Sequence, residues 1–136
     1  MKNVLVLCTG NSCRSIMGEA LINHLGQGRF KAVSAGSKPA GYIHPKSIAT
    51  LEQHGITPPQ TKSKSWDEFE QQDFDLVITV CDSASKEPCP LYLKKCQRLH
   101  WSIPDPASVT GSEAEINQAF ENAFTILKTR IEQELL

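Results

Sequence analysis

The chain has 136 residues, of which 40% are hydrophobic and 21% charged, and its formal net charge is -1. A length of this order is typical of one domain, so we expect a single domain over residues 1–136. The charge provides no basic excess for binding a phosphate backbone, which argues against a nucleic-acid partner.

The hydrophobic segments are short. The apolar run over residues 4–7 is too short for the core of a signal peptide, and no later stretch reaches the roughly 20 apolar residues of a membrane-spanning helix. We therefore expect a cytoplasmic monomer that makes no contact with a membrane.

The chain has five cysteines, an odd number. In the cytoplasm this number favours reactive thiols or a metal site over structural disulfides.

Short β-type runs alternate with helical patterns along the chain. This order predicts an α/β domain in which helices flank a four-stranded parallel sheet. Strands are expected over residues 4–7, 32–35, 76–80 and 99–101. Helices are expected over residues 14–25, from Pro45 to just before Gly55, and after the capping boxes at residues 65–68 and 112–115. The second of these helices is expected to bury Ile48, Ala49 and Leu51.

Three reactive side chains follow predicted strands. Cys8 follows the first strand, Cys81 the third and Asp105 the fourth. Ligands of open parallel sheets bind beyond the carboxyl ends of the strands, so we expect these three residues to meet at one edge of the sheet.

The most informative motif is CTGNSCRS at residues 8–15, between the first strand and the first helix. Backbone N–H groups of such a loop, together with the helix N-terminus, can surround a tetrahedral oxyanion, while Arg14 binds two of its oxygens. The same surroundings lower the pKa of Cys8, and Ser15 can donate a hydrogen bond to its thiolate. Substrate binding is therefore predicted for Thr9, Gly10, Asn11, Ser12, Cys13, Arg14 and Ser15.

The chain resembles the low-molecular-weight protein tyrosine phosphatase superfamily over nearly its whole length. The resemblance rests on CTGNSCRS followed by MGEA, on the segment SAG at residues 34–36, and on Asp105-Pro106. Within the superfamily the chain looks more like the arsenate reductases. Cys81 and Cys89 resemble the cysteine pair of the thioredoxin-coupled type, and Ala107 stands where phosphatases commonly carry an aromatic residue.

The resemblance implies a relay of thiols. Cys8 would attack arsenate held by Arg14, with Asp105 as general acid, and phosphate or sulfate would compete for the same loop. Cys81 would then attack Cys8, and a resolving cysteine, Cys89 or Cys96, would attack Cys81. Thioredoxin or a glutaredoxin–glutathione system would reduce the final disulfide.

No resident cofactor is implied, apart from a potassium ion. Some reductases of this family hold such an ion near the positions of Asn11 and Ser34.

Cys13, inside the loop, is expected to pack beneath the anion site, or to pair with Cys8 under oxidation as the phosphatase resemblance suggests.

Three other functions fit parts of the pattern. A phosphatase acting on phosphotyrosine or aryl phosphates needs only Cys8, Arg14 and Asp105. A phosphocarrier would need Cys8 alone. A zinc site could be formed by Cys81, Cys89, Cys96 and His100, although their spacing lacks the two-residue knuckle common in zinc sites. Otherwise His100 is expected to be a core residue, and no metal ligands are assigned.

Overall fold

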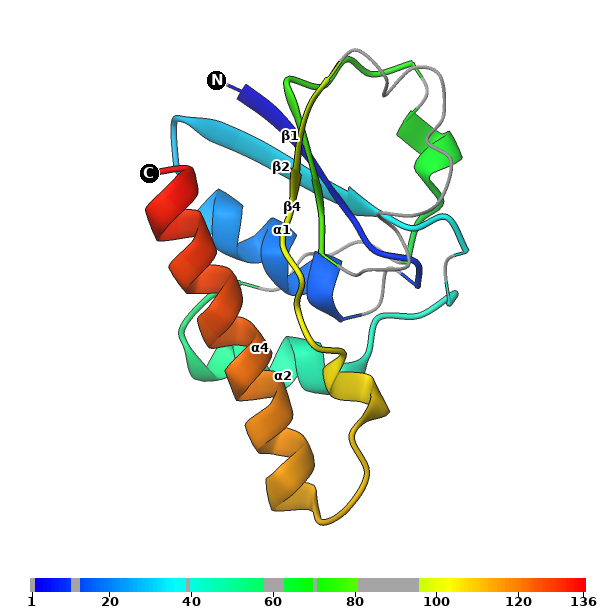
Figure 1. Ribbon diagram of the computed structural model, residues 1–136, viewed down its shortest axis with the longest axis vertical. Coiled ribbons are helices and arrows are strands. Elements are labelled where there is room, and N and C mark those ends of the chain that lie inside the picture. Colours follow the sequence, from blue (N-terminus) through cyan, green and yellow to red (C-terminus); the bar gives the residue numbers. More distant parts are fainter. Residues whose placement is uncertain (1, 11–12, 39, 58–62, 70, 81–95) are drawn as a thin grey trace.

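The computed structural model describes residues 2–10, 13–38, 40–57, 63–69, 71–80 and 96–136. Within this part of the chain, four parallel strands form one sheet (Figure 1). Their order in the sheet is β2-β1-β3-β4. The strands are β1 (Lys2–Leu7), β2 (Phe30–Ala35), β3 (Leu76–Thr79) and β4 (Gln97–His100). The predicted α/β fold with a four-stranded parallel sheet is therefore confirmed.

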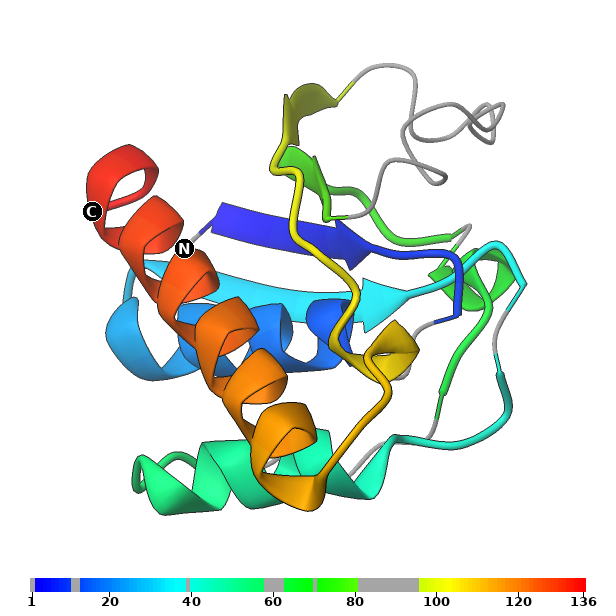
Figure 2. The same ribbon diagram turned by 60° about the horizontal axis from the view of Figure 1, so that its bottom comes forward.

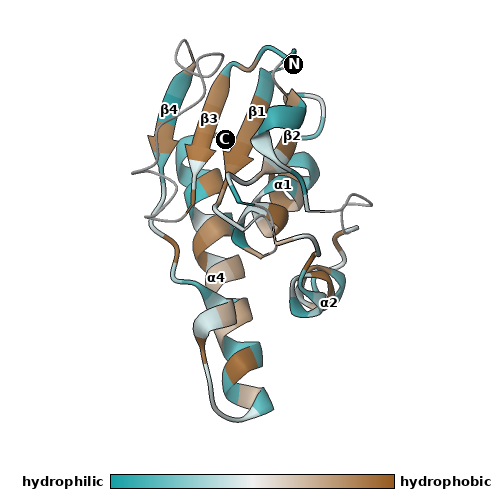
Figure 3. Ribbon diagram, turned by 90° about the vertical axis from the view of Figure 1, so that its right-hand side faces the viewer, coloured by the Kyte–Doolittle hydropathy of each residue, from teal (hydrophilic) through white to brown (hydrophobic). Residues whose placement is uncertain are grey.

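Strand β1 is central and is covered on both faces. Val4, Leu5, Val6 and Leu7 are each at most 1% exposed, as expected for a continuous apolar run in a parallel sheet. Val4 and Val6 belong to the main core, whereas Leu5 and Leu7 pack in a smaller cluster that includes Trp66. Strand β4 lies at an edge and is largely exposed, and its first half is hydrophilic in Figure 3.

Three helices lie on the side of the sheet that holds the main core (Figure 2). They are α1 (Arg14–Leu25), α2 (Pro45–Gln53) and α4 (Glu113–Glu134). Helix α2 packs against the other two rather than on the sheet. The predicted capping box opens α4, because the Ser112 hydroxyl accepts a hydrogen bond from the N–H of Glu115 at 3.2 Å. The capping box at residues 65–68 opens a short 3-10 helix, η1 (Trp66–Phe69), over the opposite face.

Helix α2 differs from its prediction in the face that it buries. Leu51 is fully buried, but Ala49 is exposed and Ile48 only half-buried. Ser47 and Thr50 are buried instead. The Thr50 hydroxyl donates to the carbonyl of Lys46 at 2.7 Å, so its burial does not leave a polar group unpaired.

Among the described residues, the search for a helix with the length and apolar character needed to span a membrane found none.

The contact between α4 and α1 provides a test of the core. Leu127 is fully buried and packs beside Gly18 of α1, where its Cδ2 atom lies 3.8 Å from the position of an added Cβ. We predict that Leu127→Ala lowers the free energy of unfolding by about 2–5 kcal/mol, because it leaves a cavity between the helices. Urea denaturation would measure this change.

Its matched control is Lys128→Ala on the exposed side of the same helix, which should change the free energy of unfolding by less than about 0.5 kcal/mol. Equal stability of the two variants would show that α4 does not pack as described.

Candidate active site

Cys8 lies at the carboxyl edge of the sheet, directly after β1. Its N–H donates to the carbonyl of Ala35 at 3.2 Å, and the N–H of Val80 donates to the carbonyl of Leu7 at 2.9 Å. Cys8 is therefore held between the ends of β2 and β3, and it is 5% exposed. The predicted position of this residue at the strand end is confirmed.

The segment after β2 orients the beginning of the oxyanion loop. The carbonyls of Thr9 and Gly10 accept hydrogen bonds from the N–H groups of Lys38 at 3.0 Å and Ala40 at 2.8 Å, and the Ser63 hydroxyl donates to Gly10 at 3.1 Å. No described peptide bond is cis. In a trans peptide the N–H points opposite to the carbonyl, so the N–H of Gly10 is directed away from the segment after β2.

Arg14 is the first residue of α1, and its guanidinium is positioned from the far side of the site. Its Nη1 donates to the carbonyl of Ile103 at 2.9 Å, and its Nη2 lies 3.7 Å from Oδ2 of Asp105. Its Nε is buried and has no hydrogen-bond acceptor among the described residues. A buried donor without an acceptor, beside the positive end of a helix dipole, fits an oxyanion ligand.

Asp105 has two roles in the structure. It caps the 3-10 helix η3 (Pro106–Ser108), because its Oδ1 accepts from the N–H of Ala107 at 3.0 Å. Its other oxygen faces Arg14, and its side chain is 41% exposed. An exposed carboxyl beside Arg14 would be within reach of the leaving oxygen of an oxyanion bound by that arginine, which suits a general acid.

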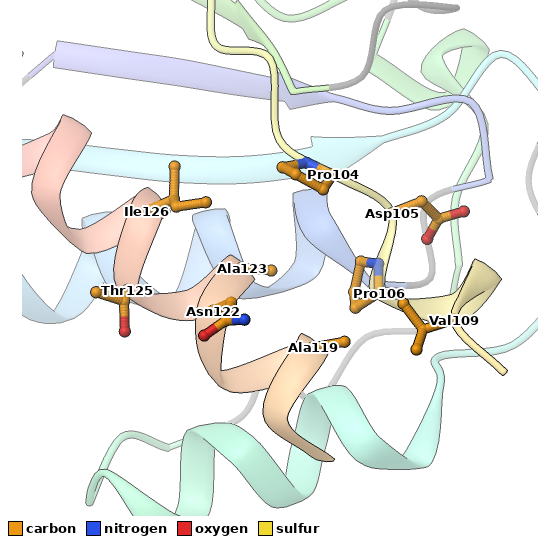
Figure 4. A pocket seen from close by; sticks show the side chains of 9 residues that line it. All are labelled: Pro104, Asp105, Pro106, Val109, Ala119, Asn122, Ala123, Thr125 and Ile126. Carbon is orange, nitrogen blue, oxygen red and sulfur yellow. The ribbon is translucent and has the colours of Figure 1, made fainter. Parts of the chain in front are cut away.

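An apolar cavity of about 470 Å³ separates the Asp105 segment from α4. Pro104, Pro106 and Val109 line it on one side, and Ala119 and Ile126 line it on the other. In Figure 4 the carboxyl group of Asp105 points away from the α4 side chains. The cavity therefore adjoins the back of this segment, opposite the carboxyl group that faces Arg14.

His44 is a neighbour of the site that the sequence did not reveal. Its Nδ1 accepts from the N–H of Lys46 at 3.1 Å and so caps α2, and its ring lies 4.9 Å from that of Phe120. Burial and the charge of Lys46 lower the pKa of His44, whereas the carboxylate of Asp105 opposes this shift. His44 is therefore within electrostatic reach of Asp105. Pro45 at the start of α2 could have indicated the cap but not this proximity.

The remaining loop residues are only partly described. Cys13 is 4% exposed and belongs to the main core, which agrees with packing beneath the anion site. Ser15 is fully buried, and its predicted hydrogen bond to Cys8 stays a prediction. The predicted site residues that lie outside the described part of the chain are Asn11, Ser12, Cys81 and Cys89.

The alternative of a zinc site formed by Cys81, Cys89, Cys96 and His100 is wrong in so far as it needs Cys96 and His100 to bind the same ion. Cys96 precedes β4 and His100 ends it, so their Cα atoms lie about 13 Å apart along the strand. The two side chains are too short to close this gap and bring their sulfur and nitrogen atoms within the roughly 4 Å that separates two ligands of one zinc ion. His100 is also exposed rather than buried in the core, and its Nδ1 lies 2.7 Å from the Thr79 hydroxyl. The described residues contain no group of three or more potential metal ligands.

A second polar cluster lies in the protein interior and involves Ser34. The Ser34 hydroxyl donates to Oε1 of Glu19 at 2.9 Å, and the ammonium of Lys64 lies 3.9 Å from the same oxygen. Burial raises the pKa of Glu19, while Lys64 and Ser34 act in the opposite direction. A potassium ion at Ser34 would be a second cation beside a buried ammonium, so these surroundings do not fit it.

Comparison with known proteins agrees with this geometry. The family model described as low molecular weight phosphotyrosine protein phosphatase matches residues 3–135. An arsenate reductase of Bacillus licheniformis is 36% identical over 115 residues, which cover 84% of this chain and 81% of the relative. Arsenate reductase 2 of Staphylococcus epidermidis is 32% identical over 130 residues, covering 95% and 98%.

Among solved structures, an arsenate reductase in a phosphate-binding state superposes with a TM-score of 0.82 at 28% identity. The match covers 98% of this chain and 95% of that one. A family model that spans almost the entire chain, together with full-length relatives above 30% identity, decides the assignment. The chain belongs to the low molecular weight phosphotyrosine protein phosphatase family.

Proposed function

We propose that this protein reduces arsenate to arsenite by a relay of cysteine thiols that begins at Cys8. The observation that carries the proposal is the pairing of two strand ends. Val80 N–H donates to the Leu7 carbonyl, and a cysteine follows each of these residues directly in the sequence, Cys8 after Leu7 and Cys81 after Val80. Hydrolysis of a phosphate ester requires only the first of these thiols. Relatives at 36% and 32% identity are named arsenate reductases, which supports the same function.

The first step forms a bond between sulfur and arsenic. The loop amides and Arg14 hold arsenate, and the Cys8 thiolate attacks its arsenic atom. Asp105 donates a proton to the departing oxygen, which leaves as water. Phosphate and sulfate have the same tetrahedral shape and negative charge, so they compete for this loop.

The second step reduces arsenic. The Cys81 thiolate attacks the Cys8 sulfur, the sulfur–arsenic bond breaks, and its electron pair leaves with arsenic as arsenite. A Cys8–Cys81 disulfide remains. A resolving thiolate then attacks Cys81, which releases Cys8 as a thiolate for the next cycle and leaves a second disulfide on the enzyme.

We assign the resolving role to Cys89 rather than Cys96. Cys96 stands at the start of β4, and its sulfur donates to the carbonyl of Phe74 at 3.2 Å. Val80, which precedes Cys81, lies at the opposite end of the neighbouring strand. Burial also raises the pKa of the Cys96 thiol, so its attacking thiolate is disfavoured.

An external dithiol protein completes the cycle by reducing the Cys81–Cys89 disulfide. Thioredoxin supplies two thiols in one protein and matches this product directly. A glutaredoxin–glutathione system is the alternative, and the assay below separates the two reductants.

The relay predicts different effects for the cysteines. With thioredoxin, thioredoxin reductase, NADPH and arsenate, the wild type should oxidise NADPH continuously, whereas Cys81→Ser and Cys89→Ser should stop after at most one turnover. Cys96→Ser is the matched control and should turn over like the wild type. Mass spectrometry should find about one equivalent of arsenite per enzyme for Cys89→Ser and none for Cys81→Ser, because arsenite leaves in the step that Cys81 performs.

Sustained turnover by Cys81→Ser would contradict the relay. Replacing thioredoxin with glutaredoxin and glutathione identifies the reductant. Absence of turnover in both systems, with equal cleavage of p-nitrophenyl phosphate by wild type and Cys81→Ser, would replace the reductase with a phosphatase.

The general-acid role predicts that Asp105→Asn lowers kcat by about 10²–10⁴-fold while KM for arsenate changes less. Asparagine retains an oxygen that can cap η3, so the change removes the proton donor rather than the turn. Steady-state kinetics at several pH values would measure the loss.

Asp67→Asn, at an exposed aspartate of η1, is the control and should leave kcat unchanged. A kcat for Asp105→Asn within twofold of the wild type would exclude Asp105 as the acid.

A further inference from the structure

Glu19, Ser34 and Lys64 form a buried polar cluster that the thiol relay does not use. Their residues are 6%, 0% and 8% exposed. The Ser34 hydroxyl and the Lys64 ammonium both approach the same carboxylate oxygen of Glu19, at 2.9 Å and 3.9 Å. Burying a carboxylate and an ammonium together is costly, and well-packed apolar side chains could often fill such a space at less cost. A pair of this kind therefore calls for a role beyond packing.

Each member of the cluster belongs to a segment that shapes the oxyanion loop. Glu19 lies on α1, which begins at Arg14. Ser34 lies on β2 and is paired with Val6, immediately before the residue whose carbonyl binds the N–H of Cys8.

Lys64 connects to the loop through its backbone and its neighbour. Its carbonyl accepts from the N–H of Gly36 at 2.8 Å, and the hydroxyl of the preceding residue, Ser63, donates to the carbonyl of Gly10 at 3.1 Å. The ammonium of Lys64 therefore links the segment that holds Gly10 to the helix that carries Arg14.

We propose that the ammonium of Lys64 acts as a built-in cation for the oxyanion loop. It supplies from the chain itself the positive charge at Glu19 and Ser34 that a bound potassium ion would supply, so the protein binds oxyanions without potassium. Lys64 is thus a positioning residue that acts through Glu19 and Ser63. The inference rests on the proposed oxyanion loop but not on which oxyanion is turned over.

The test replaces the charge and asks whether an external ion restores it. Lys64→Met keeps much of the side-chain volume and removes the ammonium. Sulfate affinity would be measured as protection of Cys8 from iodoacetamide, located by peptide mass mapping. The salts are the chlorides of potassium, sodium and tetramethylammonium at equal ionic strength, and thermal unfolding is followed in each.

The wild type should behave alike in all three salts. Lys64→Met in tetramethylammonium should lose sulfate affinity by about tenfold, a typical coupling between two sites, and should regain most of it in potassium. Its melting temperature should also rise in potassium, because an ion that binds only the folded state stabilises it.

Three further variants make the result specific. Lys31→Met changes an exposed lysine on β2 and should resemble the wild type. Lys64→Arg keeps the charge and should retain sulfate affinity without potassium. In the double variant Glu19→Gln/Lys64→Met the cluster has no carboxylate with which potassium could pair. Potassium should therefore not restore its sulfate affinity.

A wild type whose sulfate affinity or melting temperature rises in potassium would overturn the inference, and this arm does not depend on the folding of any variant. Wild-type behaviour of Lys64→Met in tetramethylammonium would also overturn it. If no anion protects Cys8 in the wild type, the oxyanion loop and this inference both fail. A wild type that binds sulfate but does not reduce arsenate overturns the proposed function alone.

Discussion

The site depends on the hydrogen bonds that fix the carboxyl end of β1 between its two neighbours. The carbonyl of Leu7 accepts from Val80 on one side, and the N–H of Cys8 donates to Ala35 on the other. The side chains of β1 pack alternately in two different clusters, Val4 and Val6 in the main core and Leu5 and Leu7 in the smaller one. A slip of one residue would exchange the two sets, so packing on both faces opposes a shift in register. The thiol of Cys8 therefore begins from a position set by the whole sheet.

From that fixed point, hydrogen bonds to other segments hold the start of the proposed oxyanion loop and the arginine that follows it. The carbonyls of Thr9 and Gly10 are bound by the segment after β2, and the guanidinium of Arg14 is bound by the Ile103 carbonyl. These bonds are made within the chain itself, so the backbone of Thr9 and Gly10 and the side chain of Arg14 are held in place when the protein folds. Preorganisation of this kind favours tight binding and lets the same donors act on charge that develops during reaction.

Local pattern was enough to predict the elements, the place of Cys8 directly after β1 and the place of Arg14 at the start of α1. The apolar run of β1, the capping box at Ser112 and the spacing between Cys8 and Arg14 each depend on neighbours in sequence. What could not be predicted depends on tertiary contacts. A lysine such as Lys64 in a polar stretch is normally exposed, and its burial beside Glu19 depends on a contact with another segment. The electrostatic effect of Asp105 on His44 is a similar case, because the two residues belong to different segments.

The buried cluster also bears on how the loop tolerates a doubly charged substrate. An oxyanion held by Arg14 would add negative charge at the N-terminus of α1, and the ionised form of Glu19 adds more further along the same helix. Without a nearby cation these charges would repel one another through a poorly screening interior. The ammonium of Lys64 neutralises the charge of Glu19 within the fold, and because it is covalently attached it cannot be lost by dilution. A bound ion would do the same work only at a concentration above its dissociation constant.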